Sequence, residues 1–376
     1  MTGWRRVGLE REGSQGSPAP GKRAGTGTTG KSPTGRRSTA RRTTRRRIPL
    51  VFALLIVLLV AALLVSSLTG QFPVPPDAVF RSILRGPSAA DPIESALWHI
   101  RFPRLALGVV IGAALGVAGA VMQGVFANPL AEPAVVGVSA GSAVGACTAI
   151  VLGLSMSATA VPAAAFIGGL GTTFLVYALS LARRRTNVLV LVLTGIAVNA
   201  VANAVIAFLV FAADPAGREQ IVFWQLGSLN GASWRAVAVT APMAASGIVV
   251  AALIARQFDL FALGERAAGH LGVDVERLRF LSILVVAVLS AAAVSFAGII
   301  GFVGLIVPHV LRLMIGPLHR TLIPASAIGG ALLVVSADVI ARTLVPFADL
   351  PIGMFTALVG GPIFLVLLRR SVGSAR

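Results

Sequence analysis

The sequence predicts an all-α protein that crosses a membrane about ten times. Apolar residue types make up 56% of the 376 residues and charged types only 12%, whereas a soluble domain carries about 25% charged residues. The apolar residues gather in runs that approach the roughly 20 residues of helix needed to cross the hydrocarbon layer. A chain with so few polar side chains cannot cover its own surface in water. We therefore expect a multi-pass protein of the inner or plasma membrane.

Ten apolar segments are the candidate spans. The eighth is short and contains Pro308, which removes a backbone donor, so we expect a half-length or broken helix there. The segments are 50–69, 104–125, 135–153, 159–181, 188–211, 235–255, 280–300, 303–316, 322–342 and 352–368. They predict one ten-span domain over residues 48–370, followed by a short tail at 371–376.

Residues 1–47 differ from the rest of the chain. They hold 13 Lys/Arg against two Glu, are rich in Gly, Ser, Thr and Pro, and show no apolar periodicity, so we expect a disordered basic tail. Residues 25–32 match a phosphate-binding glycine loop. A phosphate site needs a strand before the loop and a helix after it, and neither is indicated, so we interpret the match as chance.

The arginine run at 41–47 borders the first span. The positive-inside rule then predicts a cytoplasmic N-terminus, with a twin-arginine export signal or nucleic-acid binding as alternatives. Ten spans would place both termini in the cytoplasm, together with Arg183–Arg185 and the loop at 256–279. Six further arginines fall on the outside, an excess that suggests an acidic partner there. They are Arg81, Arg85, Arg101, Arg104, Arg218 and Arg342.

Two patterns concern how the spans pack. Small residues at every fourth position let helices approach closely in lipid, and two spans carry glycines in this pattern. These glycines are Gly108, Gly112, Gly116, Gly137, Gly141 and Gly145. A faint repeat is also present, because Ala118-Gly119 precedes Pro129 by the same interval as Ala297-Gly298 precedes Pro308. The two copies would run in opposite directions, as in the inverted repeats of transporters.

Two longer motifs are distinctive. Residues 118–133 read AGAVMQGVFANPLAEP, and residues 298–312 read GIIGFVGLIVPHVLR. The segments 337–342 and 350–353 follow in order, and Gly360-Gly-Pro-Ile-Phe364 comes after them. With these motifs the chain resembles the permease subunits of ABC importers for iron-siderophores, haem and cobalamin. The resemblance covers about residues 50–370.

The resemblance implies a division of labour among subunits. Two permeases, a second copy or a close paralogue, would form the pathway by alternating access. Cytoplasmic ABC ATPases would drive it, and an extracytoplasmic binding protein or lipoprotein would deliver a metal chelate. The chain itself would be no enzyme and would hold no catalytic residue, cofactor or structural metal. A ferric siderophore is the expected cargo, as the commonest in the family.

The resemblance also assigns the outer arginines. Arg101, Arg104 and Arg342 match positions at which permeases receive glutamates of the binding protein. Other roles stay open at this point. Arg342 could pair with Asp338 four residues earlier on one helix face, and Arg101 and Arg104 could extend toward the interface from a span's end.

On the cytoplasmic side, the loop at 256–279 resembles the coupling segment, a small-residue helix that sits in a groove of the ATPase. The residues assigned to it are Gly264, Glu265, Arg266, Ala267, Ala268, Leu271 and Gly272. An inner gate is expected where the second span ends, although a plain structural turn is equally compatible. Its residues would be Asn128, Pro129, Leu130, Thr186 and Asn187.

A structural motif is formed by Pro308, His309 and Arg312. No second metal ligand lies near His309 in sequence, so we interpret this histidine as a packing or hydrogen-bonding residue.

Two other classes of protein fit the sequence less well. An ion-coupled secondary transporter usually needs ionisable residues near mid-membrane, and only Asp338, near the end of its span, approaches this. A membrane enzyme would need catalytic motifs such as HExxH or GxSxG, and the spans contain neither. Both classes are therefore less favoured than the permease.

Overall fold

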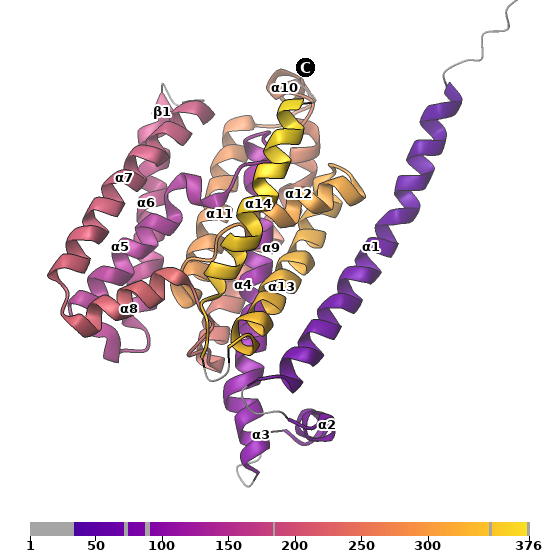
Figure 1. Ribbon diagram of the computed structural model, residues 1–376. Helices are drawn as coiled ribbons and strands as arrows, with labels where there is room; N and C mark the ends of the chain where they lie inside the picture. Colours follow the sequence, from indigo (N-terminus) through magenta and orange to yellow (C-terminus); the bar gives the residue numbers. More distant parts are fainter. Residues whose placement is uncertain (1–33, 71–73, 87–90, 183–184, 346–347, 374–376) are drawn as a thin grey trace, which may run out of the picture. The chain divides into compact units, whose positions relative to one another are not determined.

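Figure 1 shows the computed structural model of the chain. The structure describes residues 34–70, 74–86, 91–182, 185–345 and 348–373. Contacts divide the chain into two units, Met1–Arg42 and Thr43–Arg376, and the packing described below belongs to the second. Most of the predicted tail at 1–47, with the glycine loop at 25–32, lies outside the described residues, as does the end of the C-terminal tail from 374.

The elements are helices apart from one short strand pair. In order they are α1 (Thr34–Leu68), α2 (Pro76–Arg85), α3 (Pro92–Ala96), η1 (Leu97–Arg101), α4 (Phe102–Val125), η2 (Pro133–Val136), α5 (Val138–Val151), η3 (Leu154–Met156), α6 (Ala160–Ser180), β1 (Leu181–Ala182), β2 (Arg185–Thr186), α7 (Val188–Ala212), α8 (Pro215–Leu226), α9 (Trp234–Phe261), α10 (Glu265–His270), α11 (Val275–Ala297), α12 (Val303–Ile315), α13 (His319–Thr343) and α14 (Ile352–Gly373). The strands β1 and β2 form an antiparallel pair in which Leu181 is opposite Thr186.

All ten predicted spans are helices. Among the described residues, seven helices are long and apolar enough to cross a membrane, and three shorter apolar helices accompany them, which are α5, α12 and the apolar part of α14. This confirms the predicted fold class. The first helix starts earlier than expected, at Thr34, because no glycine or proline interrupts the chain between Gly35 and Pro49, and arginine and alanine favour helix.

Helix α4 lies at the centre of the bundle. It packs against α9, α11, α12 and α13, and from Ile111 onward most of its residues are buried. Helices α5, α6, α7 and α8 form a second group that joins the first where α5 and α6 contact α11. Figure 1 shows this group beside the helices around α4.

The predicted glycine contacts are confirmed. A side chain on Gly112 or Gly116 would overlap the backbone of α13 at Ser326 and Gly330, and the same relation joins α5 to α6 through Gly141 and Gly168. Helix backbones therefore touch directly. In lipid, where burial of apolar surface adds little, such close contact supplies much of the packing energy.

Helix α12 is half-length, as predicted, and continues through Pro308. A proline inside a helix leaves the carbonyl four residues earlier without its usual donor, which here is the carbonyl of Gly304. The buried amide of Gln123 replaces that donor, because its Nε2 donates to Gly304 O at 3.3 Å and to Leu305 O at 3.1 Å. The polar residue of α4 therefore stabilises the proline-containing helix beside it.

The two ends of the bundle carry different residues. Helix α4 begins beside Asp338 and Asp349 and ends beside Phe258 and His319, whereas α11 begins at the end that carries α10. The two helices are therefore antiparallel, as an inverted repeat requires. We call the end with Arg104 the arginine end and the end with α10 the loop end; Figure 1 draws α3 near the first and labels α10 at the second.

Candidate functional site

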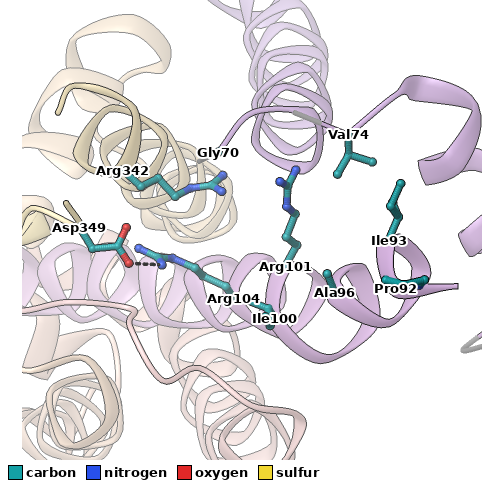
Figure 2. Close-up of a pocket in the computed structure, with 10 residues that line it drawn as sticks. All are labelled: Gly70, Val74, Pro92, Ile93, Ala96, Ile100, Arg101, Arg104, Arg342 and Asp349. Carbon is teal, nitrogen blue, oxygen red and sulfur yellow. Dashed lines mark hydrogen bonds and ion pairs between the residues drawn. The ribbon is translucent and has the colours of Figure 1, made fainter. Parts of the chain in front are cut away.

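Three arginines share one pocket at the arginine end (Figure 2). The pocket has a volume of about 580 Å³ and is lined by α3, η1, the start of α4 and the end of α13. Arg101, Arg104 and Arg342 lie on its wall together with Asp349. The structure thus brings together all three arginines that were assigned to docking, although Arg342 is far from Arg101 and Arg104 in the sequence.

Asp338 holds two of these arginines. Its Oδ1 lies 2.9 Å from Arg104 Nη2, and its Oδ2 lies 3.2 Å from Arg342 Nε. Asp349 pairs with Arg104 Nη1 at 3.0 Å, the interaction drawn in Figure 2. Only 3% of the Asp338 side chain is exposed, so its charge is compensated by the two guanidinium groups rather than by water.

The arginines also cap α1. Arg101 Nη1 donates to Ser67 O at 2.6 Å, and Arg342 donates to Ser66 O at 2.6 Å and Thr69 O at 3.1 Å. The last carbonyls of a helix lack partners within the helix and carry partial negative charge. Arginine supplies both the missing hydrogen-bond donors and a compensating positive charge. These contacts therefore attach the first span to α4 and α13.

The docking prediction is therefore modified by the geometry. Arg342 is buried and makes the predicted pair with Asp338, while Arg104 is mostly enclosed by two carboxylates rather than extended toward the interface. Three arginines against two aspartates leave the cluster one excess positive charge. Asp349 and the α1 carbonyls were not predicted, because nothing local in the sequence indicates contacts between helices so far apart.

At the loop end, the exposed surface around α10 combines three glycines and two leucines with the charged side chains of Glu265 and Arg266. Gly264 and Gly272 have φ angles of +101° and +85°, values that favour glycine, and they turn the chain into and out of the helix. Arg266 and Leu271 are exposed, and added side chains on Gly264 and Gly272 would meet open space. A second protein could therefore approach this backbone closely.

Two residues assigned to the coupling face make contacts within the chain. Ala268 is fully buried, so it packs inside the chain. Glu265 forms an ion pair with Arg279 of α11, which also pairs with Glu276 at 3.1 Å and lies over the Phe261 ring. These contacts fix α10 to the ends of α9 and α11. Ala267 is half-buried and lies between the two faces.

The residues assigned to the gate have local roles in the described part of the chain. Asn128 Oδ1 accepts a hydrogen bond from Leu130 N at 2.9 Å, which forms a tight turn at Pro129. Asn187 Oδ1 accepts from Leu189 N at 2.9 Å and caps α7. Thr186 belongs to β2, and its side chain lies outside the described residues.

The two long motifs meet face to face between α4 and α12. A side chain on Gly119 would overlap Gly304. Gln123 Oε1 accepts from Arg312 at 3.1 Å, and Glu132 accepts from Phe302 N at 2.8 Å.

His309 of the structural motif faces the carbonyl of Pro129. The polar groups Gln123 and Glu132 were quoted in the motif but given no role. The sequence does contain a signal for Gln123, because a polar amide within an otherwise apolar run indicates a buried hydrogen-bonding role.

A bundle of short and long apolar helices with a charged pocket at one end and an exposed loop helix at the other indicates a multi-pass membrane protein. Comparison with known proteins identifies its family. A model of the FecCD transport family matches residues 55–370, and the chain belongs to that family. It is the permease subunit of an ABC importer, in which ATP hydrolysis is carried out by a separate subunit.

The relatives agree with this assignment. The chain is 39% identical to the hemin transport system permease of Yersinia pestis over 74% of this chain and 85% of that protein. It is 46% identical to the cobalamin import system permease of Halobacterium salinarum, over 72% of each. A solved structure described as an inward-facing metal-chelate type ABC transporter superposes with a TM-score of 0.76 at 31% identity, covering 86% of this chain and 99% of that one. An ion-coupled secondary transporter is thereby excluded.

Proposed function

We propose that this permease forms, with a second copy or a close paralogue, the pathway through which a ferric siderophore enters the cytoplasm. The observation that carries the proposal is the separation of two surfaces, an arginine pocket at one end and an exposed helix flanked by open glycines at the other. Both termini and α10 would face the cytoplasm, in agreement with the arginines at 41–47 and 183–185. The relatives named for hemin and cobalamin carry metal chelates of other kinds.

The two ends would have different partners. ABC ATPases would seat on α10, where Gly264, Leu271 and Gly272 leave the backbone accessible. A substrate-binding protein would place acidic side chains at the arginine pocket, whose excess positive charge favours them. The turn at Asn128–Leu130 and the α6–α7 hairpin at Thr186 and Asn187 would border the inner gate.

Uptake by a strain deleted for this gene tests the function and the coupling face together. Leu271→Asp introduces a charge into the surface on which the ATPase would seat, so we expect uptake of labelled ferric siderophore to fall at least tenfold. The matched control is Leu318→Asp, because Leu271 and Leu318 are 56% and 54% exposed and both lie at the loop end. Wild-type protein and the control are expected to restore uptake.

Three results of this experiment would contradict the proposal. Uptake of labelled haem or cobalamin, but not of any ferric siderophore, would assign another cargo to the same permease. Equal loss in both leucine variants would indicate a general effect of charge at this end. Normal uptake by Leu271→Asp would remove α10 from the ATPase contact.

Charge reversal at Arg101 tests docking. Because Arg104 and Arg342 are committed to Asp338, Arg101→Glu is the substitution that changes the pocket with least effect on the buried pairs. We expect the dissociation constant of the binding protein to rise about tenfold at low salt, roughly 1.4 kcal/mol, and the difference to shrink as ionic strength increases. Binding to the permease in nanodiscs measures it.

Arg218→Glu is the control for this charge reversal. Arg218 is exposed on α8, outside the pocket and, by the alternation of the spans, at the same end. An equal effect of both reversals would show that only net charge matters. Arg101→Glu also removes the hydrogen bond to Ser67 O, so some loss of thermal stability is expected, and binding is compared on the folded, monodisperse fraction of each variant. An Arg101→Glu protein with unchanged affinity would contradict the docking role.

A further inference from the structure

Helix α2 has three faces of different character. Residues three and four apart share one face of a helix, and in α2 this spacing separates buried, apolar and charged side chains. The buried face holds Ala78, Val79 and Ser82. The exposed apolar face holds Phe80, Ile83 and Leu84, which are 66%, 60% and 71% exposed. The charged face holds Asp77, Arg81 and Arg85.

Trp98 lies against the buried face of α2, and Trp234 lies against Trp98. Trp98 Nε1 donates to Ser82 O at 3.1 Å, and Trp234 Nε1 donates to Trp98 O at 2.8 Å. The two ring systems are 6.1 Å apart, and Trp234 remains exposed. Tryptophan with a bonded N–H is enriched where a membrane meets water. This pair therefore indicates that α2 lies at the depth of the lipid headgroups.

Contacts hold α2 beside the end of the first span. Val74 N, just before α2, donates to Leu68 O at 3.3 Å, and Leu68 packs against the apolar cluster that includes Ala78 and Val79 of α2. The last turns of α1 expose Leu64 and Val65, apolar side chains suited to lipid. In Figure 1, α2 is viewed nearly along its axis while α1 is seen from the side, so α2 crosses the direction of the span.

From these observations we infer that α2 is an interfacial helix that lies in the lipid surface at the arginine end. Phe80, Ile83 and Leu84 enter the boundary of headgroups and acyl chains, while Arg81 and Arg85 contact lipid phosphate. An amphipathic helix of this kind binds by its buried apolar area together with attraction of its cations to anionic lipid. The buried face meanwhile keeps the helix on Trp98.

Lipid suits this surface better than a protein partner does. The apolar and charged faces lie on different sides of a helix that is already seated on the protein, so one side can meet acyl chains while the other meets water. The segment also continues directly from a lipid-facing span. Because Gly70 and Val74, which precede α2, line the arginine pocket, seating α2 in lipid would hold that wall in place.

Spin labels test the inference on the full chain reconstituted in nanodiscs of anionic lipid. In a Cys147→Ser background, which removes the single cysteine, labels are placed by Phe80→Cys and Leu84→Cys, with Asp77→Cys and Arg81→Cys as matched controls. The ratio of oxygen to nickel-chelate accessibility reports depth. We expect this ratio to be at least threefold higher at 80 and 84 than at 77 and 81.

Equal ratios at all four positions would overturn the inference. Labels at 80 and 84 that are exposed to water, and that become protected only when a binding protein is added, would also overturn it and would assign this face to protein docking. All four positions are exposed in the structure, so the labels leave the packing intact. Identical gel-filtration profiles of the labelled variants check this point.

Discussion

Replacing Asp338 by alanine is expected to destabilise the folded permease strongly. The carboxylate compensates Arg104 and Arg342 at 2.9 and 3.2 Å in a nearly water-free site. Removing one partner of a buried ion pair costs about 3–5 kcal/mol, because the remaining charge is left without compensation. We expect the free energy of unfolding to fall within this range, because Arg342 loses its carboxylate partner while Arg104 keeps only Asp349.

Thermal unfolding of the purified permease in detergent measures the effect, with the monodisperse fraction as a second readout. Asp77→Ala is the control, because Asp77 pairs with Arg81 at 3.0 Å on an exposed helix surface, where a pair contributes about 0–1 kcal/mol. Asp338→Asn should lie between the two, since its amide oxygen still accepts from one arginine. Unfolding of Asp338→Ala at the wild-type temperature would contradict the structural role of this cluster.

The unfolding measurement also bears on how uptake in the arginine variants is interpreted, because those variants can lose stability as well as the contact with the binding protein. Arg104 and Arg342 were assigned to the binding protein from the sequence, yet their side chains are held inside the chain by Asp338 and the α1 carbonyls. Loss of uptake in variants of these two arginines would therefore report misfolding as well as lost contact. Arg101 also donates to Ser67 O, so unfolding and binding must be measured on the same Arg101 variant to tell the two effects apart.

The sequence was sufficient for the spans because the membrane itself sets their length. The segment expected at 188–211 is α7 (Val188–Ala212), and the half-length segment at 303–316 is α12 (Val303–Ile315). The short helices α2, α3 and α8 were not predicted. They lie between the spans, where no fixed length applies, although Asp214 and Pro215 at the start of α8 form a recognisable start signal.

The sequence indicated which residues belong to each candidate site but not which partners those residues contact. The motif residues correctly indicated three arginines at one end and a short helix in the 256–279 loop. Their partners depend on helix packing, which brings Arg104 to Asp349 and Glu265 to Arg279. No local pattern reports such contacts, and for this reason Ala268 was placed on a surface that the structure buries.

Gly119→Ala is expected to have an effect of comparable size through packing. A methyl group at this position would overlap the backbone of Gly304, and a backbone cannot move aside as a flexible side chain does. Overpacking costs about 1–3 kcal/mol, occasionally more. Here the cost should lie at or above the upper end, because separating α4 from α12 also lengthens the hydrogen bonds from Gln123 to the Gly304 and Leu305 carbonyls.

Gly171→Ala is the matched control, because it makes the same chemical change within helix α6 at a position with open space around it. Alanine favours helix over glycine by roughly 0.5–1 kcal/mol, so this variant should unfold at or above the wild-type temperature. The two substitutions are thus expected to shift stability in opposite directions. Thermal unfolding of Gly119→Ala indistinguishable from that of Gly171→Ala would show that α4 and α12 do not meet backbone to backbone, and the role of Gln123 beside Pro308 would be lost with that contact.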